Sequence, residues 1–111
     1  MKYIEEYEFF ELESLVKRFI KVIDVNITGN TPDFYNILKR MNRNVEMCIK
    51  SGSEYSYELL DLVKWDWNNA TKPGLGMKAY YIWKDNYDDR IRINNEIKNI
   101  IEDIDSIIYG Y

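Results

Sequence analysis

Aromatic side chains gather in one stretch of this chain. All three tryptophans and three of the ten tyrosines fall between residues 65 and 87, and several aspartates stand beside them. Indole and phenol rings bury a large area at low entropic cost, so they dominate the energetic centres of protein interfaces. This pattern predicts a partner-binding patch. Its members are Trp65, Asp66, Trp67, Tyr80, Tyr81, Trp83, Asp85, Tyr87, Asp88 and Asp89.

The carboxylates around these rings indicate what kind of partner would fit. An acidic rim about an aromatic centre favours a basic protein surface, because opposite charges steer the encounter while the rings make the desolvated contact. Asp61 adds a further carboxylate to the expected rim. Basic surfaces are common on nucleic-acid-handling enzymes, and a small acidic protein docked there would block their substrate.

The same rings could instead close over a local core. Trp65 and Trp67 stand at i,i+2 and cannot share one face of a helix, and the run from Tyr80 to Trp83 cannot all point inward from a helix. Some of these side chains should therefore be exposed, or they should pack on one another around the loop between them. The sequence leaves both outcomes open.

The residue types that most often carry catalysis are scarce. The chain has no histidine, which removes the commonest general base and metal ligand. Cys48, the single cysteine, lies on the apolar face of an expected helix and is interpreted as a small buried hydrophobe. One cysteine forms neither an internal disulfide nor a zinc site, so no cofactor is expected.

Pairs of carboxylates suggest one enzymatic alternative. Glu8 and Glu11 form an E-x-x-E element, and Glu58 and Asp61 form an E-x-x-D element. Such pairs on two helices of an all-α domain resemble those of the MazG-type nucleotide pyrophosphatases. The resemblance implies that these four residues would hold magnesium around a nucleoside triphosphate. A full additional helix separates the two elements, which departs from the family pattern.

Composition and charge narrow the remaining classes of function. The chain has 111 residues, the size of one domain, and its net charge of −4 argues against direct nucleic-acid binding by phosphate neutralisation. A basic set that could still touch nucleic acid is Lys17, Arg18, Lys21, Lys39, Arg40 and Arg43. No apolar run approaches the ~20 residues that span a bilayer, and no secretory signal is recognisable. We therefore expect no membrane association. The single cysteine favours a reducing, cytoplasmic location, and the enrichment in Asn, Ile, Lys and Tyr suggests a prokaryote or a phage-infected cell.

Hydrophobic spacing predicts helices almost throughout. The predicted helices cover about residues 3–24, 32–50, 54 to 65 or 67, and 77–108. Thr31 and Pro32 are a start signal, and Gly29 is an expected left-handed stop. The fold class is all-α: a small, single, four-helix bundle-like domain with a long irregular loop at about 68–76 and a long C-terminal helix. The sequence does not decide whether residues 79–83 form a helix or a strand.

These observations favour a non-enzymatic, acidic binding protein. Its expected action is to inhibit or sequester a larger, basic, nucleic-acid-handling protein, as phage anti-defence, host-takeover and toxin-immunity proteins do. The alternative is a homo-oligomeric assembly protein, because isoleucines follow a heptad-like spacing along the C-terminal helix and Asn94 stands at a core position where it could set the register. The pyrophosphatase-like enzyme is the third class.

Overall fold

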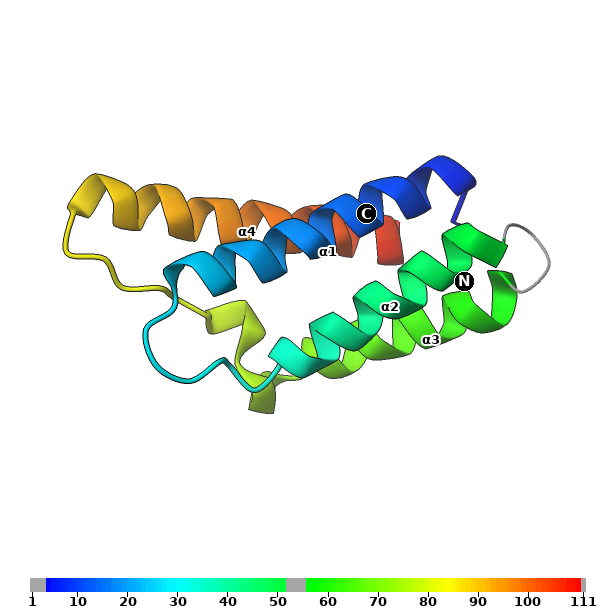
Figure 1. Cartoon of the computed structure of the whole chain (residues 1–111), viewed down its shortest axis with the longest axis horizontal. Coiled ribbons are helices and arrows are strands. Elements are labelled where there is room, and N and C mark those ends of the chain that lie inside the picture. The colour runs from blue at the N-terminus through cyan, green and yellow to red at the C-terminus, as the bar shows by residue number, and fades with distance from the viewer. Residues whose placement is uncertain (1–3, 52–55, 111) are drawn as a thin grey trace.

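The computed structural model describes residues 4–51 and 56–110 and is all-helical in these ranges (Figure 1). The elements in chain order are α1 (Glu6–Asn26), α2 (Tyr35–Ser51), α3 (Ser56–Ala70), the short 3₁₀ turns η1 (Pro73–Leu75) and η2 (Met77–Ala79), and α4 (Tyr87–Tyr109). The predicted all-α, four-helix class is confirmed, as is the long C-terminal helix.

The helices run up and down in two pairs. In Figure 1, α1 lies antiparallel to α4, and α2 lies antiparallel to α3 below them. The two pairs are joined mainly through α1 and α2. The bundle is elongated, with extents of 48 × 23 × 22 Å, because the first half of α4 continues beyond α2 and α3 (Figure 1).

Aliphatic stripes from all four helices fill the core, as the spacing predicts. On α1 the buried stripe includes Leu12, Val16, Phe19 and Ile23. Phe19 packs against Phe34, with ring centroids 5.8 Å apart. The buried stripe of α4 consists of Ile93, Ile97, Ile100, Ile101, Ile104, Ile107 and Ile108. These isoleucines are therefore buried by contacts within a single chain.

Local signals move some helix ends away from their predicted positions. Helix α1 begins at Glu6, where Glu5 and Glu8 form a capping box that satisfies two backbone donors. Helix α2 begins at Tyr35 and not at Pro32, because a turn closed by the Tyr35 N–H and the Pro32 carbonyl oxygen (3.0 Å) comes first. Gly29 has the expected positive φ of 98°, although α1 has already ended at Asn26.

The largest difference lies between residues 77 and 86, where the spacing predicts helix. The chain instead makes η2, runs extended from Tyr80 and bends at Asp85 and Asn86, the N-cap of α4. In a helix, the four bulky side chains of residues 80–83 would point in different directions around the axis, so they could not all reach the core. As an extended segment, the chain turns Ile82 inward and leaves Tyr81 and Trp83 exposed. Ala79 thus ends the 3₁₀ turn η2, and residues 80–83 are neither helix nor a strand of a sheet.

None of the helices in the described ranges is long and apolar enough to span a membrane.

Stability should fall at alkaline pH. Burial raises the pKa of the Cys48 thiol from 9.0 to about 11, a hydrogen bond to Asp24 raises the pKa of Tyr35, and burial raises that of Tyr80. Since the unfolded chain loses these protons at lower pH, the folded state binds more protons between about pH 9 and 11, and its free energy of unfolding decreases there. Urea denaturation at a series of pH values in this range should show a midpoint that falls as the pH rises. The fall should be less steep in Cys48→Ala. A flat midpoint would contradict these assignments.

Candidate partner-binding site

The ten residues predicted to bind a partner do not form one patch. Asp66 and Trp67 are buried, with exposed fractions of 1% and 0%. Trp65 is exposed on α3, where its ring lies against Arg40 of α2. The other seven predicted residues lie at 80–89, on the extended segment and the start of α4.

Trp67 is a core residue, which corrects its assignment to a surface. Its position two residues from Trp65 turns it to the opposite side of α3, into the bundle. The indole Nε1 donates a hydrogen bond to Asp105 Oδ1 of α4 (2.8 Å). The second oxygen of Asp105 pairs with Lys78 of η2. Trp67 therefore ties α3, α4 and the loop before α4 together.

Asp66 is likewise removed from the expected acidic rim. Its carboxylate accepts hydrogen bonds from Arg40 Nε (2.7 Å) and Asn44 Nδ2 (2.8 Å), and Arg40 also forms a salt bridge with it at 2.6 Å. This buried charge is paired because an unpaired one would be costly. The same guanidinium lies 5.4 Å from the Trp65 ring centroid, so it packs against the face of this ring.

Four exposed apolar side chains, Tyr81, Trp83, Tyr87 and Ile91, lie along the extended segment and the first turns of α4; we name them the aromatic edge. The exposed fractions of the first three are 54%, 66% and 65%. Trp83 is nevertheless held in place. The Arg90 guanidinium stacks 4.0 Å from its ring centroid. The Trp83 Nε1 also donates to an oxygen of Asp85 at 3.2 Å.

The side-chain amide of Asn94 fixes the extended segment to α4. Its Oδ1 accepts from the Ile82 N–H, and its Nδ2 donates to the Ile82 carbonyl, both at 2.8 Å. The sequence interpretation of Asn94, as a residue that could set the register of an oligomer, is not needed to explain this polar side chain. Asn94 uses its amide within the chain.

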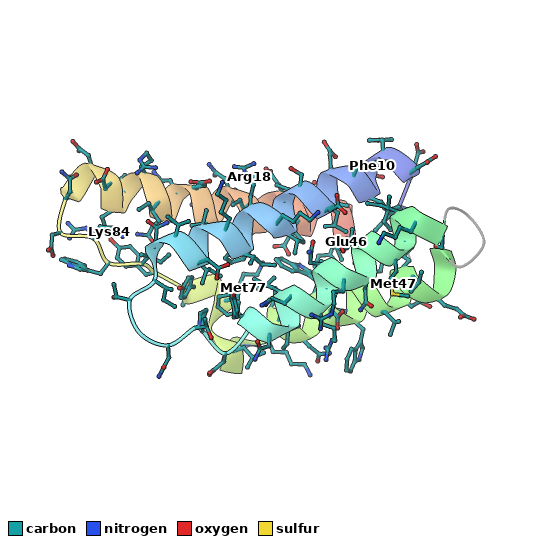
Figure 2. The ribbon with its side chains drawn as sticks, in the orientation of Figure 1. Phe10, Arg18, Glu46, Met47, Met77 and Lys84 are labelled. Carbon is teal, nitrogen blue, oxygen red and sulfur yellow. The ribbon has the colours of Figure 1, made fainter. Side chains whose placement is uncertain are left out.

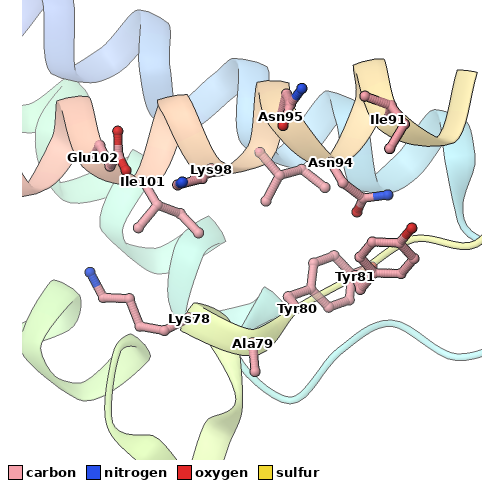
Figure 3. Close-up of a pocket in the computed structure, with 11 residues that line it drawn as sticks. Lys78, Ala79, Tyr80, Tyr81, Ile91, Asn94, Asn95, Lys98, Ile101 and Glu102 are labelled. Atoms are coloured by element: carbon pink, nitrogen blue, oxygen red, sulfur yellow. The ribbon is translucent and has the colours of Figure 1, made fainter. Parts of the chain in front are cut away.

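A groove of about 570 Å³ runs between α4 and residues 78–81 (Figure 3). Tyr80 and Tyr81 form one wall, and Ile91 and Ile101 belong to the α4 wall. Tyr80 is half-buried, and its ring meets Phe34 edge-on at 5.2 Å. Tyr80 therefore supports the groove from inside and contributes less to the outer surface than the aromatic edge does.

Charges around the aromatic edge are more balanced than predicted. The carboxylates Asp85, Asp88 and Asp89 are exposed, as expected. The bases Lys84, Arg90 and Arg92 lie among them in the sequence. A guanidinium nitrogen of Arg92 lies 3.4 Å from a carboxylate oxygen of Asp89, and the guanidinium of Arg90 stacks on the Trp83 ring. Residues 84–92 therefore carry no net formal charge.

A second exposed apolar area on α2 and α3 was missed by the sequence analysis. Met47 and Leu62 are exposed and, with Leu59, line a groove of about 500 Å³ (Figure 2 labels Met47). Leu60 and Val63 are buried on α3, whereas Leu62, between them in the sequence, is exposed. Apolar residues stand in a run on this helix, so spacing alone does not show which of them stays at the surface.

The carboxylate pairs do not gather into a metal site within the described ranges. Glu8 is buried, and its Oε1 accepts from the Glu5 N–H (3.2 Å) as part of the helix cap. Glu58 and Asp61 are exposed on α3. No three histidine, cysteine or carboxylate residues among the described ones are placed to hold a metal ion.

Comparisons with protein-family models, with curated proteins and with solved structures found no match to this chain.

Trp67→Phe tests the corrected role of Trp67. The change leaves space in the core and removes a donor from Asp105, so the free energy of unfolding should fall by about 2–3 kcal/mol. The control Trp65→Phe alters an exposed ring and should change it by less than about 0.5 kcal/mol. Urea denaturation measures both. Equal effects of the two substitutions would show that Trp67 is not buried as described.

Asn94→Ala should free the extended segment while leaving α4 helical. Without the amide, the Ile82 N–H loses its partner, and its hydrogen exchange should accelerate at least about tenfold. The neighbouring Asn95→Ala, an exposed position on the same helix, should leave this exchange rate unchanged. Residue-resolved amide exchange provides the readout, and an unaltered Ile82 rate in Asn94→Ala would refute the anchor.

Proposed function

We propose that this protein is a non-enzymatic binding protein that docks on another protein through the aromatic edge. The observation that carries the proposal is the state of Trp83, which is two-thirds exposed and yet held by Arg90 and Asp85. These contacts join the extended segment to α4, yet they leave most of the indole exposed. A partner pocket that received it would bury a large apolar area.

Preorganisation makes this ring a suitable interface anchor. Binding usually costs the ordering of side chains at the interface, about 0.5–1.5 kcal/mol for each flexible one. The cation–π contact with Arg90 and the hydrogen bond to Asp85 restrict the ring before binding. Tyr81 and Tyr87 extend the same surface with rings that keep a polar tip for a wet rim.

The net charge of −4 for the whole chain favours a basic partner, although the charges beside the aromatic edge are balanced. The protein carries 19 carboxylates and 15 bases, and Asp85 and Asp88 stand beside the exposed rings. Opposite charge steers the encounter, and the aromatic edge supplies contact at close range. The proposed target is a larger protein with a basic, nucleic-acid-handling surface, which this chain inhibits or sequesters by covering it. Phage anti-defence, host-takeover and toxin-immunity proteins are of this type.

Matched tryptophan variants test the proposal. Immobilised wild-type protein should capture a protein with a basic surface from lysate of the native host. Purified, that partner should bind Trp83→Ala at least about thirtyfold more weakly, because a truncated anchor costs about 2 kcal/mol or more. Trp65→Ala, which removes the exposed indole on α3, is the control and should bind normally. Biosensor titration measures the affinities.

Circular dichroism melting should show that both variants keep the fold. Added salt should slow association with the partner, since exposed charges are screened. If Trp83→Ala binds as tightly as wild type, or if Trp65→Ala is the variant that loses binding, the aromatic edge is not the docking site.

A further inference from the structure

Residues 80–84 have the burial pattern of a β-strand. Ile82 is buried and Tyr80 is half-buried, whereas Tyr81 and Trp83 are exposed. This alternation has the period of two that an extended chain produces. Beyond Lys84 the chain bends at Asp85 and Asn86 into α4. Residues 80–84 are therefore an isolated extended segment that lies beside a helix (Figure 3).

Side chains of α4 occupy one edge of this strand. In an extended chain, the backbone groups of alternate residues point to opposite edges. The Ile82 N–H and carbonyl both pair with the Asn94 amide, which presents a donor and an acceptor as a neighbouring peptide would. Two residues on, the Lys84 carbonyl faces the same helix and accepts from Arg90 at 3.5 Å.

The other edge carries the backbone groups of Tyr81 and Trp83. Within the described part of the chain, these N–H and carbonyl groups make no hydrogen bond. Backbone donors and acceptors are paired in nearly all folded proteins, by protein or by water. A row of unpaired groups along an extended segment is a template for another strand. The run Tyr-Tyr-Ile-Trp also has the residue types that favour strands.

We propose that the partner binds by strand addition: an extended segment of the partner pairs with the outer edge at Tyr81 and Trp83. This inference rests on the proposed function and names the partner element that it requires. The partner segment carries apolar or aromatic side chains across from the exposed rings, where cross-strand pairs stabilise a ladder. It carries lysine or arginine near Asp85, the exposed carboxylate that accepts a hydrogen bond from Trp83 Nε1. Backbone pairing would supply affinity, and the alternate side chains would supply specificity.

A library of random linear peptides is the probe for this edge. Peptides displayed on phage would be selected on immobilised wild-type protein. The expected sequences alternate apolar residues with lysine or arginine. In residue-resolved hydrogen exchange, an enriched synthetic peptide should slow the Tyr81 and Trp83 amides at least about tenfold, while the Ile82 amide, already bonded to Asn94, should change little.

A backbone-only variant separates strand pairing from simple contact with the indole. Replacing Trp83 by its α-hydroxy acid analogue turns the amide into an ester and keeps the ring. Loss of one N–H donor should weaken peptide binding about threefold to tenfold. The comparison is the same ester at Lys84, which removes an N–H on the α4 side and makes the Trp83 carbonyl a weaker acceptor; because no outer-edge donor is lost, it should weaken binding less than the Trp83 ester does. Melting curves should be alike for both esters.

Several results would overturn strand addition. These are the absence of any enriched peptide, enriched peptides that leave the Tyr81 and Trp83 amides unprotected, and a Trp83 ester that binds like wild type. Light scattering on the free protein adds another: a dimer that protects these amides would make a second copy the occupant. The captured partner could lose binding to Trp83→Ala and still bind the Trp83 ester as tightly as wild type. That result would support the docking site and rule out strand addition. If no partner depends on Trp83→Ala, the proposed function fails.

Discussion

The amide of Asn94 substitutes for a neighbouring strand. A run of four bulky residues from Tyr80 to Trp83 cannot be packed inward from a helix, and an extended segment alone would leave its backbone unpaired. Asn94 resolves this conflict with two hydrogen bonds to Ile82, in the half of α4 that projects beyond α2 and α3. Helix α1 packs along α4, and the extended segment lies against the first half of α4 where α2 and α3 do not reach. The exposed rings follow from this arrangement.

The bundle also separates structural aromatic residues from exposed ones. Trp67 is buried in the core, where its indole donates a hydrogen bond to Asp105. Asp105 in turn pairs with Lys78 of the loop before α4. Trp83 is left outside but is restrained by Arg90 and Asp85. A rigid, partly apolar edge beside two carboxylates is a surface suited to protein recognition. The function proposed above is built on this difference between the two indoles.

Much of the fold could be predicted because it rests on periodic aliphatic residues. The isoleucines of α4 and the stripe of α1 have a spacing that only a helix satisfies, and tertiary contacts agree with it. The extended segment could not be placed, since the rings of Tyr80 and Trp83 also fit a helical spacing. Its conformation depends on Asn94, which is twelve residues from Ile82 in the sequence. No local pattern reports such a pairing.

The candidate site could be predicted only in part, because the burial of its residues depends on contacts between helices. Spacing shows that Trp65 and Trp67 face opposite ways, but it does not say which of them faces the core. The burial of Asp66 depends on Arg40 and Asn44 of α2, so the carboxylate could not be separated from the exposed aspartates by sequence alone. Met47 was missed because its exposure depends on how α2 packs against α3.

Nuclear magnetic resonance of the free protein tests the central claim most directly, through the couplings that cross hydrogen bonds and the proton contacts within residues 77–90. The account predicts a coupling between the Ile82 amide and Asn94, together with the sequential contacts of an extended chain from Tyr80 to Lys84 and α-helical contacts only from Tyr87. Helical contacts that continue unbroken from residue 77 into α4, with no coupling to Asn94, would contradict it.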